Sequence, residues 1–130
     1  MRARAFPIVV TPVEKLRIVG DNIFASMAQF PRKFQAMNLE FSIMASQRDS
    51  LAPGIERRYN KIRSFIEDII VEGINSGDFR GEVSPRDVAA LLFATADGLT
   101  LHYATAGVDI EWQHIEKAFL DLALNGLIRR

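Results

Sequence analysis

The chain has 130 residues, of which 48% are hydrophobic and 25% charged, a composition typical of one globular domain that excludes a wholly disordered chain. Sixteen basic residues balance sixteen acidic ones, so the surface as a whole is not one that attracts nucleic acid. The absence of cysteine and the presence of only two histidines exclude disulfide frameworks, thiolate zinc sites, iron–sulfur clusters and histidine-rich metal sites.

Two amphipathic helices are predicted in the first third of the chain. The first covers residues 12–28, because Thr11 and Glu14 form a capping box and apolar residues then recur at helical spacing. The second covers residues 31–46, where phenylalanine and methionine recur every three or four residues. A polar link with turn residues, 47–54, is expected after it.

Three further helices are predicted in the rest of the chain. The third covers residues 55–76 and ends before Gly77, a residue suited to a left-handed helix end. The fourth, residues 85–106, follows a serine–proline start signal, and the fifth, residues 110–128, follows Asp109 as its N-cap. Since no strand pattern or internal repeat is present, the predicted fold class is all-α, a five-helix bundle in which successive helices are antiparallel.

The fourth predicted helix is apolar on every side. After its first turn, Asp97 and His102 are its only residues that can carry a charge near neutral pH. The carboxylate at its centre disfavours a membrane span, and no signal peptide is evident, so a buried helix is expected. Because the fifth helix also has a wide apolar arc, we predict a two-fold homodimer with a four-helix interface; a monomer with a central fourth helix is the alternative. The candidate interface residues are Leu99, Tyr103, Trp112, Ile115, Phe119, Leu122 and Leu127.

Phenylalanine and methionine are concentrated on the first two helices. Such adaptable side chains can line a cavity for an apolar ligand, although they equally suit an ordinary core. Asp97 is isolated in an apolar run, so it is either a polar anchor in that cavity or a structural hydrogen-bonding group. His102 is interpreted as a cavity donor or as a core or interface residue. The candidate ligand-binding residues are Phe24, Met27, Phe34, Met37, Phe41, Met44, Phe65, Asp97 and His102.

Catalytic and metal-binding patterns are weak. Glu111 and His114 have the spacing of di-iron helical bundles, but the second such pair that this chemistry needs is missing. The basic residues between 57 and 63 are followed at once by acids, which is typical of a solvated face. We therefore predict no enzymatic activity, no metal and no cofactor.

Three segments in fixed order resemble the C-terminal half of TetR-type transcriptional repressors. They are Glu-Gly-Ile-Asn-Ser-Gly-Asp-Phe-Arg at 72–80, Ser-Pro-Arg-Asp-Val-Ala-Ala-Leu-Leu at 84–92 and Ala-Asp-Gly-Leu at 96–99. The Phe-Pro-Arg-Lys-Phe stretch at 30–34 and the closing helix at 115–127 are also similar to that family. The resemblance covers roughly residues 11 to 129.

This resemblance implies a cytoplasmic effector-binding and dimerisation domain at residues 11–130. In the family, inner helices surround a cavity for a small apolar or aromatic effector, and the last two helices pair with a second subunit. Residues 1–10 are interpreted as a remnant or extension, so DNA contact would need a missing N-terminal helix-turn-helix domain. Three interpretations fit this sequence: a fragment, a mis-started reading frame, or a regulator that lost its DNA-binding domain. The alternative functions are a helical protein-interaction adaptor without a small ligand and a metalloenzyme using Glu111 and His114.

Overall fold

The computed structural model describes residues 10–130, most of which lie in five α-helices. These helices are α1 (Pro12–Gln29), α2 (Arg32–Ser46), α3 (Ala52–Ser76), α4 (Pro85–Thr105) and α5 (Trp112–Leu127). The predicted all-α fold class with five helices is confirmed. In this part of the chain, no helix is long and apolar enough to cross a membrane.

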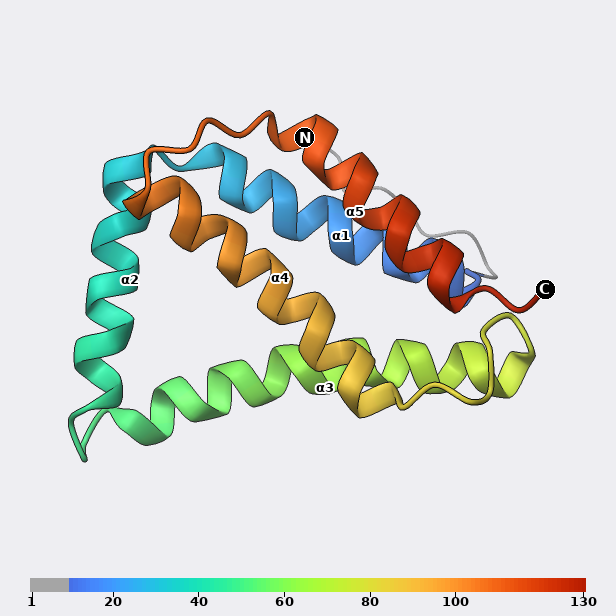
Figure 1. Ribbon diagram of the computed structural model, residues 1–130. Helices are drawn as coiled ribbons and strands as arrows, with labels where there is room; N and C mark the ends of the chain where they lie inside the picture. Colours follow the sequence, from blue (N-terminus) through green and yellow to red (C-terminus); the bar gives the residue numbers. More distant parts are fainter. Residues whose placement is uncertain (1–9) are drawn as a thin grey trace.

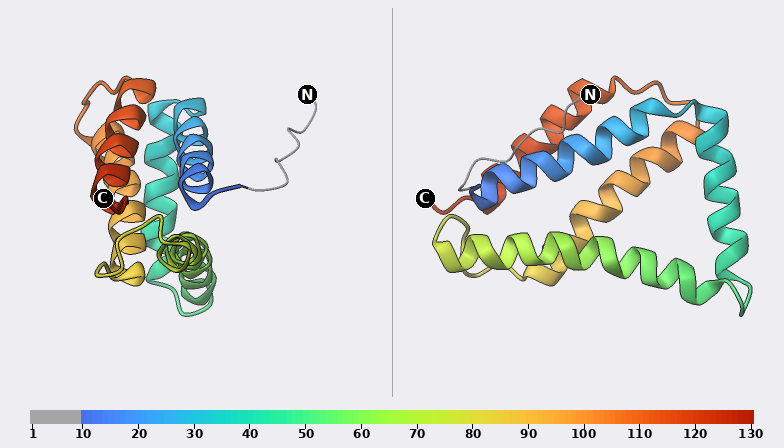
Figure 2. Two further views of the ribbon diagram at one scale, coloured as in Figure 1. Left: turned by 90° about the vertical axis from the view of Figure 1, so that its right-hand side faces the viewer. Right: turned by 180° about the vertical axis from the view of Figure 1, so that it is seen from behind.

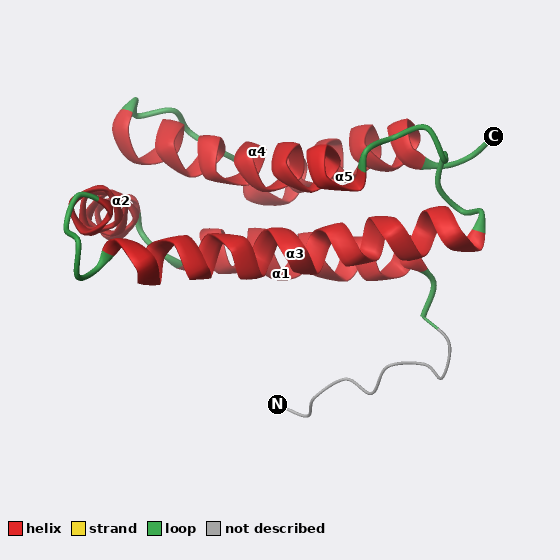
Figure 3. Cartoon of the chain, turned by 90° about the horizontal axis from the view of Figure 1, so that it is seen from below, coloured by secondary structure: helices red, strands yellow, loops and turns green. Residues whose placement is uncertain are grey.

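The helices form two layers, with α2 across one end. α1 and α3 lie in one layer, and α4 and α5 lie in the other (Figure 3). The two layers contact each other where α5 packs along α1 and where α4 crosses α3 (Figure 1). The predicted antiparallel packing of successive helices is wrong for α2, which stands across the ends of α1 and α3 instead (Figures 1 and 2). α1 and α3 therefore diverge toward α2.

Local capping signals set several helix ends, as predicted. The Thr11 hydroxyl accepts a hydrogen bond from the Glu14 backbone N–H at 3.2 Å, and the Glu14 carboxylate completes the capping box at the start of α1. At the start of α4, Ser84 accepts from the Asp87 backbone N–H at 3.2 Å. Gly77 ends α3 with a φ of 85°, a left-handed conformation that glycine adopts at little cost.

Two predicted helix starts are wrong. α3 begins at Ala52 rather than at residue 55, because Pro53 falls in the first turn, where its missing N–H is not needed for the helix. α5 begins at Trp112, and Asp109 is not its N-cap. The Asp109 carboxylate instead lies 3.4 Å from the Arg32 guanidinium, which joins the α4–α5 connection to α2.

A hydrophobic core fills the end of the molecule opposite α2. It includes Leu16 of α1, Ile70 of α3 and Leu124 of α5, together with Phe79 from the connection between α3 and α4. The C-terminus closes this end beside the same connection (Figure 2), where the Arg80 N–H donates to the Leu127 carbonyl at 2.8 Å. Since Ala89 of α4 also belongs to this core, four helices and the α3–α4 connection are held together at this end, while the α2 end is left more open.

A pair of carboxyl groups lies where α1 contacts α5. A hydrogen bond with Asp21 of α1, together with burial and the like charge, raises the pKa of Glu116 of α5 from 4.5 to about 7. Between pH 4.5 and about 7, the Glu116 carboxyl is therefore protonated in the folded chain and ionised in the unfolded chain. The resulting stabilisation is fully present below the unfolded pKa and is lost as the pH rises through about 7.

Replacing Glu116 with glutamine should remove this part of the pH dependence. We expect Glu116→Gln to raise the melting temperature at about pH 8, where the wild-type pair repels, and to change it little at about pH 5. Thermal unfolding followed by circular dichroism measures the melting temperature at each pH. Glu40→Gln, at an exposed position of α2, is the matched control and should shift neither. An equal effect of Glu116→Gln at the two pH values would contradict the pairing.

Candidate ligand cavity

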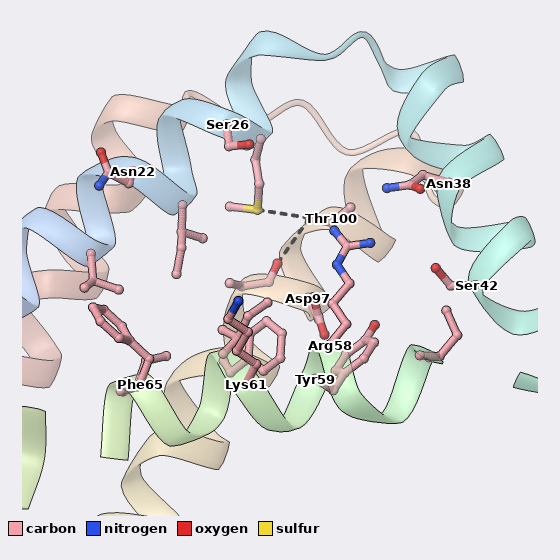
Figure 4. A pocket seen from close by; sticks show the side chains of 18 of the residues that line it. Asn22, Ser26, Asn38, Ser42, Arg58, Tyr59, Lys61, Phe65, Asp97 and Thr100 are labelled. Atoms are coloured by element: carbon pink, nitrogen blue, oxygen red, sulfur yellow. Dashed lines mark hydrogen bonds between the residues drawn. The ribbon is translucent and has the colours of Figure 1, made fainter. Parts of the chain in front are cut away.

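A cavity of about 810 Å³ lies between α1, α2, α3 and α4. It occupies the space that opens because α2 separates α1 from α3, and Figure 4 shows side chains from all four helices pointing toward it. The volume is in the range of sites that bind small organic molecules. Most of its wall is apolar, with contributions from Val19, Ile23, Met27, Phe30, Phe34, Leu39, Ile55, Ile62, Phe65, Ile66, Phe93 and Ala96.

Gln35 fixes the corner between α1 and α2 and forms part of the cavity wall. Its side chain is buried, and its Nε2 donates to the carbonyls of Met27 at 2.7 Å and Phe30 at 2.9 Å. Two acceptors thus fix the orientation of the amide, and the Oε1 atom is left without a hydrogen-bonding partner among the described residues. A buried acceptor of this kind is satisfied by a bound donor such as a hydroxyl group or a water molecule.

Asp97 of α4 lies in the cavity wall next to two side chains of α3. Burial raises the pKa of the Asp97 carboxyl, while the Arg58 guanidinium and a hydrogen bond with the Tyr59 hydroxyl oppose that rise. Burial, followed by the Asp97 charge, also raises the pKa of Tyr59. The Tyr59 ring packs on Phe93 with centroids 5.3 Å apart, so the ring belongs to the apolar wall. The Tyr59 hydroxyl supplies a polar group at the end of that ring.

Four of the predicted ligand-binding residues line the cavity: Met27, Phe34, Phe65 and Asp97. They come from four different helices, which the sequence pattern alone did not bring together. Met27 also accepts a hydrogen bond at its Sδ from the Thr100 hydroxyl at 3.0 Å, linking α1 to α4 across the cavity (Figure 4). These four residues stay candidates for ligand contact.

The other five predicted ligand-binding residues lie elsewhere. Phe24 is 1% exposed and packs in the core against Phe119 of α5, with ring centroids 5.4 Å apart. His102 is exposed in a groove between α4 and the start of α5. The remaining three, Met37, Phe41 and Met44, are exposed and do not line the cavity. After Phe34, the α2 residues that line it are Gln35, Asn38, Leu39 and Ser42, so the phenylalanine and methionine pattern continues on a different face of the helix.

Several polar residues of the cavity wall were missed by the sequence reasoning. Arg58 and Lys61 of α3 and Asn38 of α2 are the most prominent of them (Figure 4). A signal for the α3 residues existed, because Arg58, Lys61 and Phe65 recur at spacings of three and four and so share one helix face. The basic residues there were interpreted as a solvated surface, which their sequence neighbours favoured.

The outer faces of α4 and α5 expose large apolar side chains. Leu91 is 68% exposed and Leu101 45% exposed on α4, and Leu122 is 76% exposed on α5. Both helices lie in the layer that faces away from α1 and α3 (Figure 3). Nothing within the described residues covers this surface.

The predicted interface residues divide between this outer surface and the interior of the chain. Leu122 is on the outer surface, whereas Leu127 is 4% exposed and lies in the core of its own chain. Trp112 packs edge-on against Tyr103 at 5.2 Å and, with Phe119, against Phe24. Leu99 and Ile115 are half-buried in the groove between α4 and α5. Leu91 and Leu101, which are exposed on the outer surface, were not among the predicted residues.

No metal-binding group of three or more histidine, aspartate or glutamate residues occurs within residues 10–130. Glu111 and His114, the two residues of the di-iron spacing, are both exposed near the start of α5. The site that the fold presents is therefore the cavity.

Comparison with known families decides what kind of domain carries this cavity. Residues 19–116 match the model of a family described as tetracyclin repressor-like, C-terminal domain. The chain belongs to this TetR-like family. A comparison with curated protein sequences gives no significant match.

A solved structure supports the same fold for the TetR-like domain. The ketosteroid transcriptional regulator KstR2 of Mycobacterium tuberculosis superposes with a TM-score of 0.76 at 17% sequence identity. The match covers 95% of this chain and 61% of the KstR2 chain, so the TetR-like domain spans less than two thirds of that protein's length. The prediction of a TetR-type C-terminal domain is confirmed, and with it that of a regulatory rather than an enzymatic domain.

Proposed function

We propose that this TetR-like domain binds a small apolar or aromatic effector in the α1–α4 cavity and forms a homodimer through the outer faces of α4 and α5. The observation that carries the proposal is the cavity of about 810 Å³, walled mainly by apolar side chains and open to ligand between four helices. The exposed leucines of α4 and α5 supply an apolar surface that a two-fold dimer would bury.

α4 connects the two proposed activities. Its inner face contributes Phe93, Asp97 and Thr100 to the cavity, and its outer face carries Leu91 and Leu101. A ligand that prefers one position of α4 would therefore favour one arrangement of the two subunits. Since a helix 21 residues long moves largely as a rigid element, a small displacement in the cavity would reach the interface.

The DNA-binding activity expected of a complete regulator would come from a domain outside the described residues. KstR2, whose fold this chain shares, is a transcriptional regulator. We propose a cytoplasmic repressor role on the basis of the family, with effector binding altering DNA affinity through the dimer.

Ligand binding should raise the melting temperature of the purified chain. A compound at about 100 times its Kd adds about 2.7 kcal/mol of stability if it binds only the folded state. We expect some apolar or aromatic compounds in a thermal-shift screen to produce such a rise. Ser26→Trp, which places a large side chain at the cavity wall, should abolish the rise, and the neighbouring exposed position changed by Ala25→Trp should not.

The two outcomes distinguish an effector domain from the adaptor alternative. Stabilisation that Ser26→Trp removes and Ala25→Trp retains would support the effector site. The absence of any stabilising compound, together with stable association with a different protein, would favour the adaptor. The exposed apolar face of α2, which includes Met37 and Phe41, would then be the first surface to test.

A further inference from the structure

The cavity wall carries polar and apolar groups along its whole length, and its two cations both come from α3. Arg58 of α3 lies at the α2 end with Asn38 and Ser42, whereas Phe65 lies at the other end, toward α1 (Figure 4). Lys61 lies one turn from Arg58 on the same face of α3. A ligand in the cavity would therefore contact positive charge from α3 together with the apolar side chains that make up most of the wall.

The two cations of the cavity wall are not paired within the described part of the chain. The ion pairs found there join Lys15 to Glu72, Arg32 to Asp109, and Arg80 to Glu82. Neither Arg58 nor Lys61 takes part in any of them. The Arg58 guanidinium extends toward the middle of the cavity (Figure 4), where its planar set of donors is free to bind an oxyanion with two parallel hydrogen bonds.

Acidic groups of the wall do not cancel this charge. Asp97 is close enough for the Arg58 charge to act on it, but it is half-buried against α3 beside the Tyr59 hydroxyl. Asp68 lies further along α3, two to three turns from Arg58, where the cavity continues past Phe65. The positive charge of the cavity wall thus comes from Arg58 and Lys61, and of the two acids that line the cavity, Asp97 is the one on which the Arg58 charge acts.

We propose that the effector is an amphipathic carboxylic acid, whose carboxylate binds Arg58 and Lys61 and whose apolar body lies against Ile62, Phe65 and Phe93. The unpaired guanidinium aimed into a mostly apolar cavity carries this proposal, which rests on the proposed effector-binding function. Among apolar and aromatic compounds, those with a carboxylate would bind more tightly than the corresponding alcohols. Asp97 would weaken that preference, because its charge competes for the same guanidinium.

Calorimetric titration of the full chain with two matched pairs of probes tests this. The pairs are decanoate with decanol and naphthoate with naphthylmethanol, which differ in charge but little in apolar body. We expect each carboxylate to bind wild-type chain about tenfold more tightly than its alcohol, the usual effect of a charge-assisted hydrogen bond. Arg58→Gln should reduce this preference strongly, because Lys61 alone would remain to bind the carboxylate. Arg57→Gln, which removes the same charge outside the cavity, should preserve it.

A second variant checks the sign of the electrostatic effect. Asp97→Asn should raise the ratio of carboxylate affinity to alcohol affinity, a pattern that general unfolding cannot produce. Alcohols that bind wild-type chain as tightly as the carboxylates, or carboxylate binding insensitive to Arg58→Gln, would overturn the inference and leave the effector cavity standing. If no carboxylate binds, the inference is also overturned, and the thermal screen decides separately whether the proposed function fails with it.

Discussion

Replacing Gly73 with alanine should destabilise the TetR-like domain by roughly 3 kcal/mol, at the upper end of what overpacking a core usually costs. The added Cβ would overlap the ring of Phe79, lying 2.7 Å from its Cγ. The ring cannot move easily, because Phe79 is 1% exposed and its own N–H donates to the Gly73 carbonyl at 2.9 Å. Chemical denaturation followed by circular dichroism measures the change.

The control for this substitution is another helical glycine with open space around it. No atom lies within 4 Å of the Cβ position of Gly126 in α5, so Gly126→Ala should gain up to about 1 kcal/mol from helix propensity alone. If Gly73→Ala lowers the free energy of unfolding and Gly126→Ala raises it, the difference comes from the space around each glycine and not from the loss of glycine itself. If Gly73→Ala were as stable as wild type, the Phe79 ring would not be held against α3 as described.

Replacing Leu122 with glutamate should convert the proposed homodimer into a monomer. Leu122 is 76% exposed on α5, so the change should leave the folded monomer intact, but in a two-fold interface it would bury an unpaired carboxylate from each subunit. We expect the dissociation constant of the dimer to increase at least about 100-fold. Sedimentation equilibrium over a range of concentrations measures it.

The control is another large aliphatic side chain that is exposed on a different helix. Ile43 is 58% exposed on α2, which is not one of the two proposed interface helices, so Ile43→Glu should leave the dimer unchanged. A wild-type chain that is already monomeric at tens of micromolar, or a Leu122→Glu variant that dimerises normally, would contradict an interface on α5.

Helix ends were predictable where the signal is local. Thr11 and Ser84 cap helices with their own hydroxyls, and Gly77 ends one through a backbone conformation that other residues avoid. Each of these signals needs only a few consecutive residues. The start of α5 was misplaced, because Asp109 has a partner 77 residues away in sequence, Arg32, that competes with local capping.

Helix orientation was not predictable to the same degree. The direction of α2 depends on the buried Gln35 amide, which holds the carbonyls at the end of α1, and on the extended backbone at Pro31. These contacts form only once both helices exist. Since the cavity results from α2 lying across α1 and α3, its position could not be derived from helical periodicity.

The inward faces of apolar helices were the hardest feature to predict. On α5, Trp112, Phe119 and Leu122 are all apolar, yet the two aromatic residues pack on Phe24 and the leucine is exposed. A helix that is apolar on most sides has no polar face to mark which side is out. The charged wall of the cavity was missed for the opposite reason, because Arg58 has the composition of an ordinary surface residue.

The most direct measurement of the proposed effector site is a crystal structure of the chain with the most stabilising compound from the thermal screen. We expect the compound to be enclosed between α1, α2, α3 and α4, with the outer faces of α4 and α5 buried against a second copy. A compound bound outside this cavity, with α2 and α3 closed onto α1, would contradict effector binding at the proposed site.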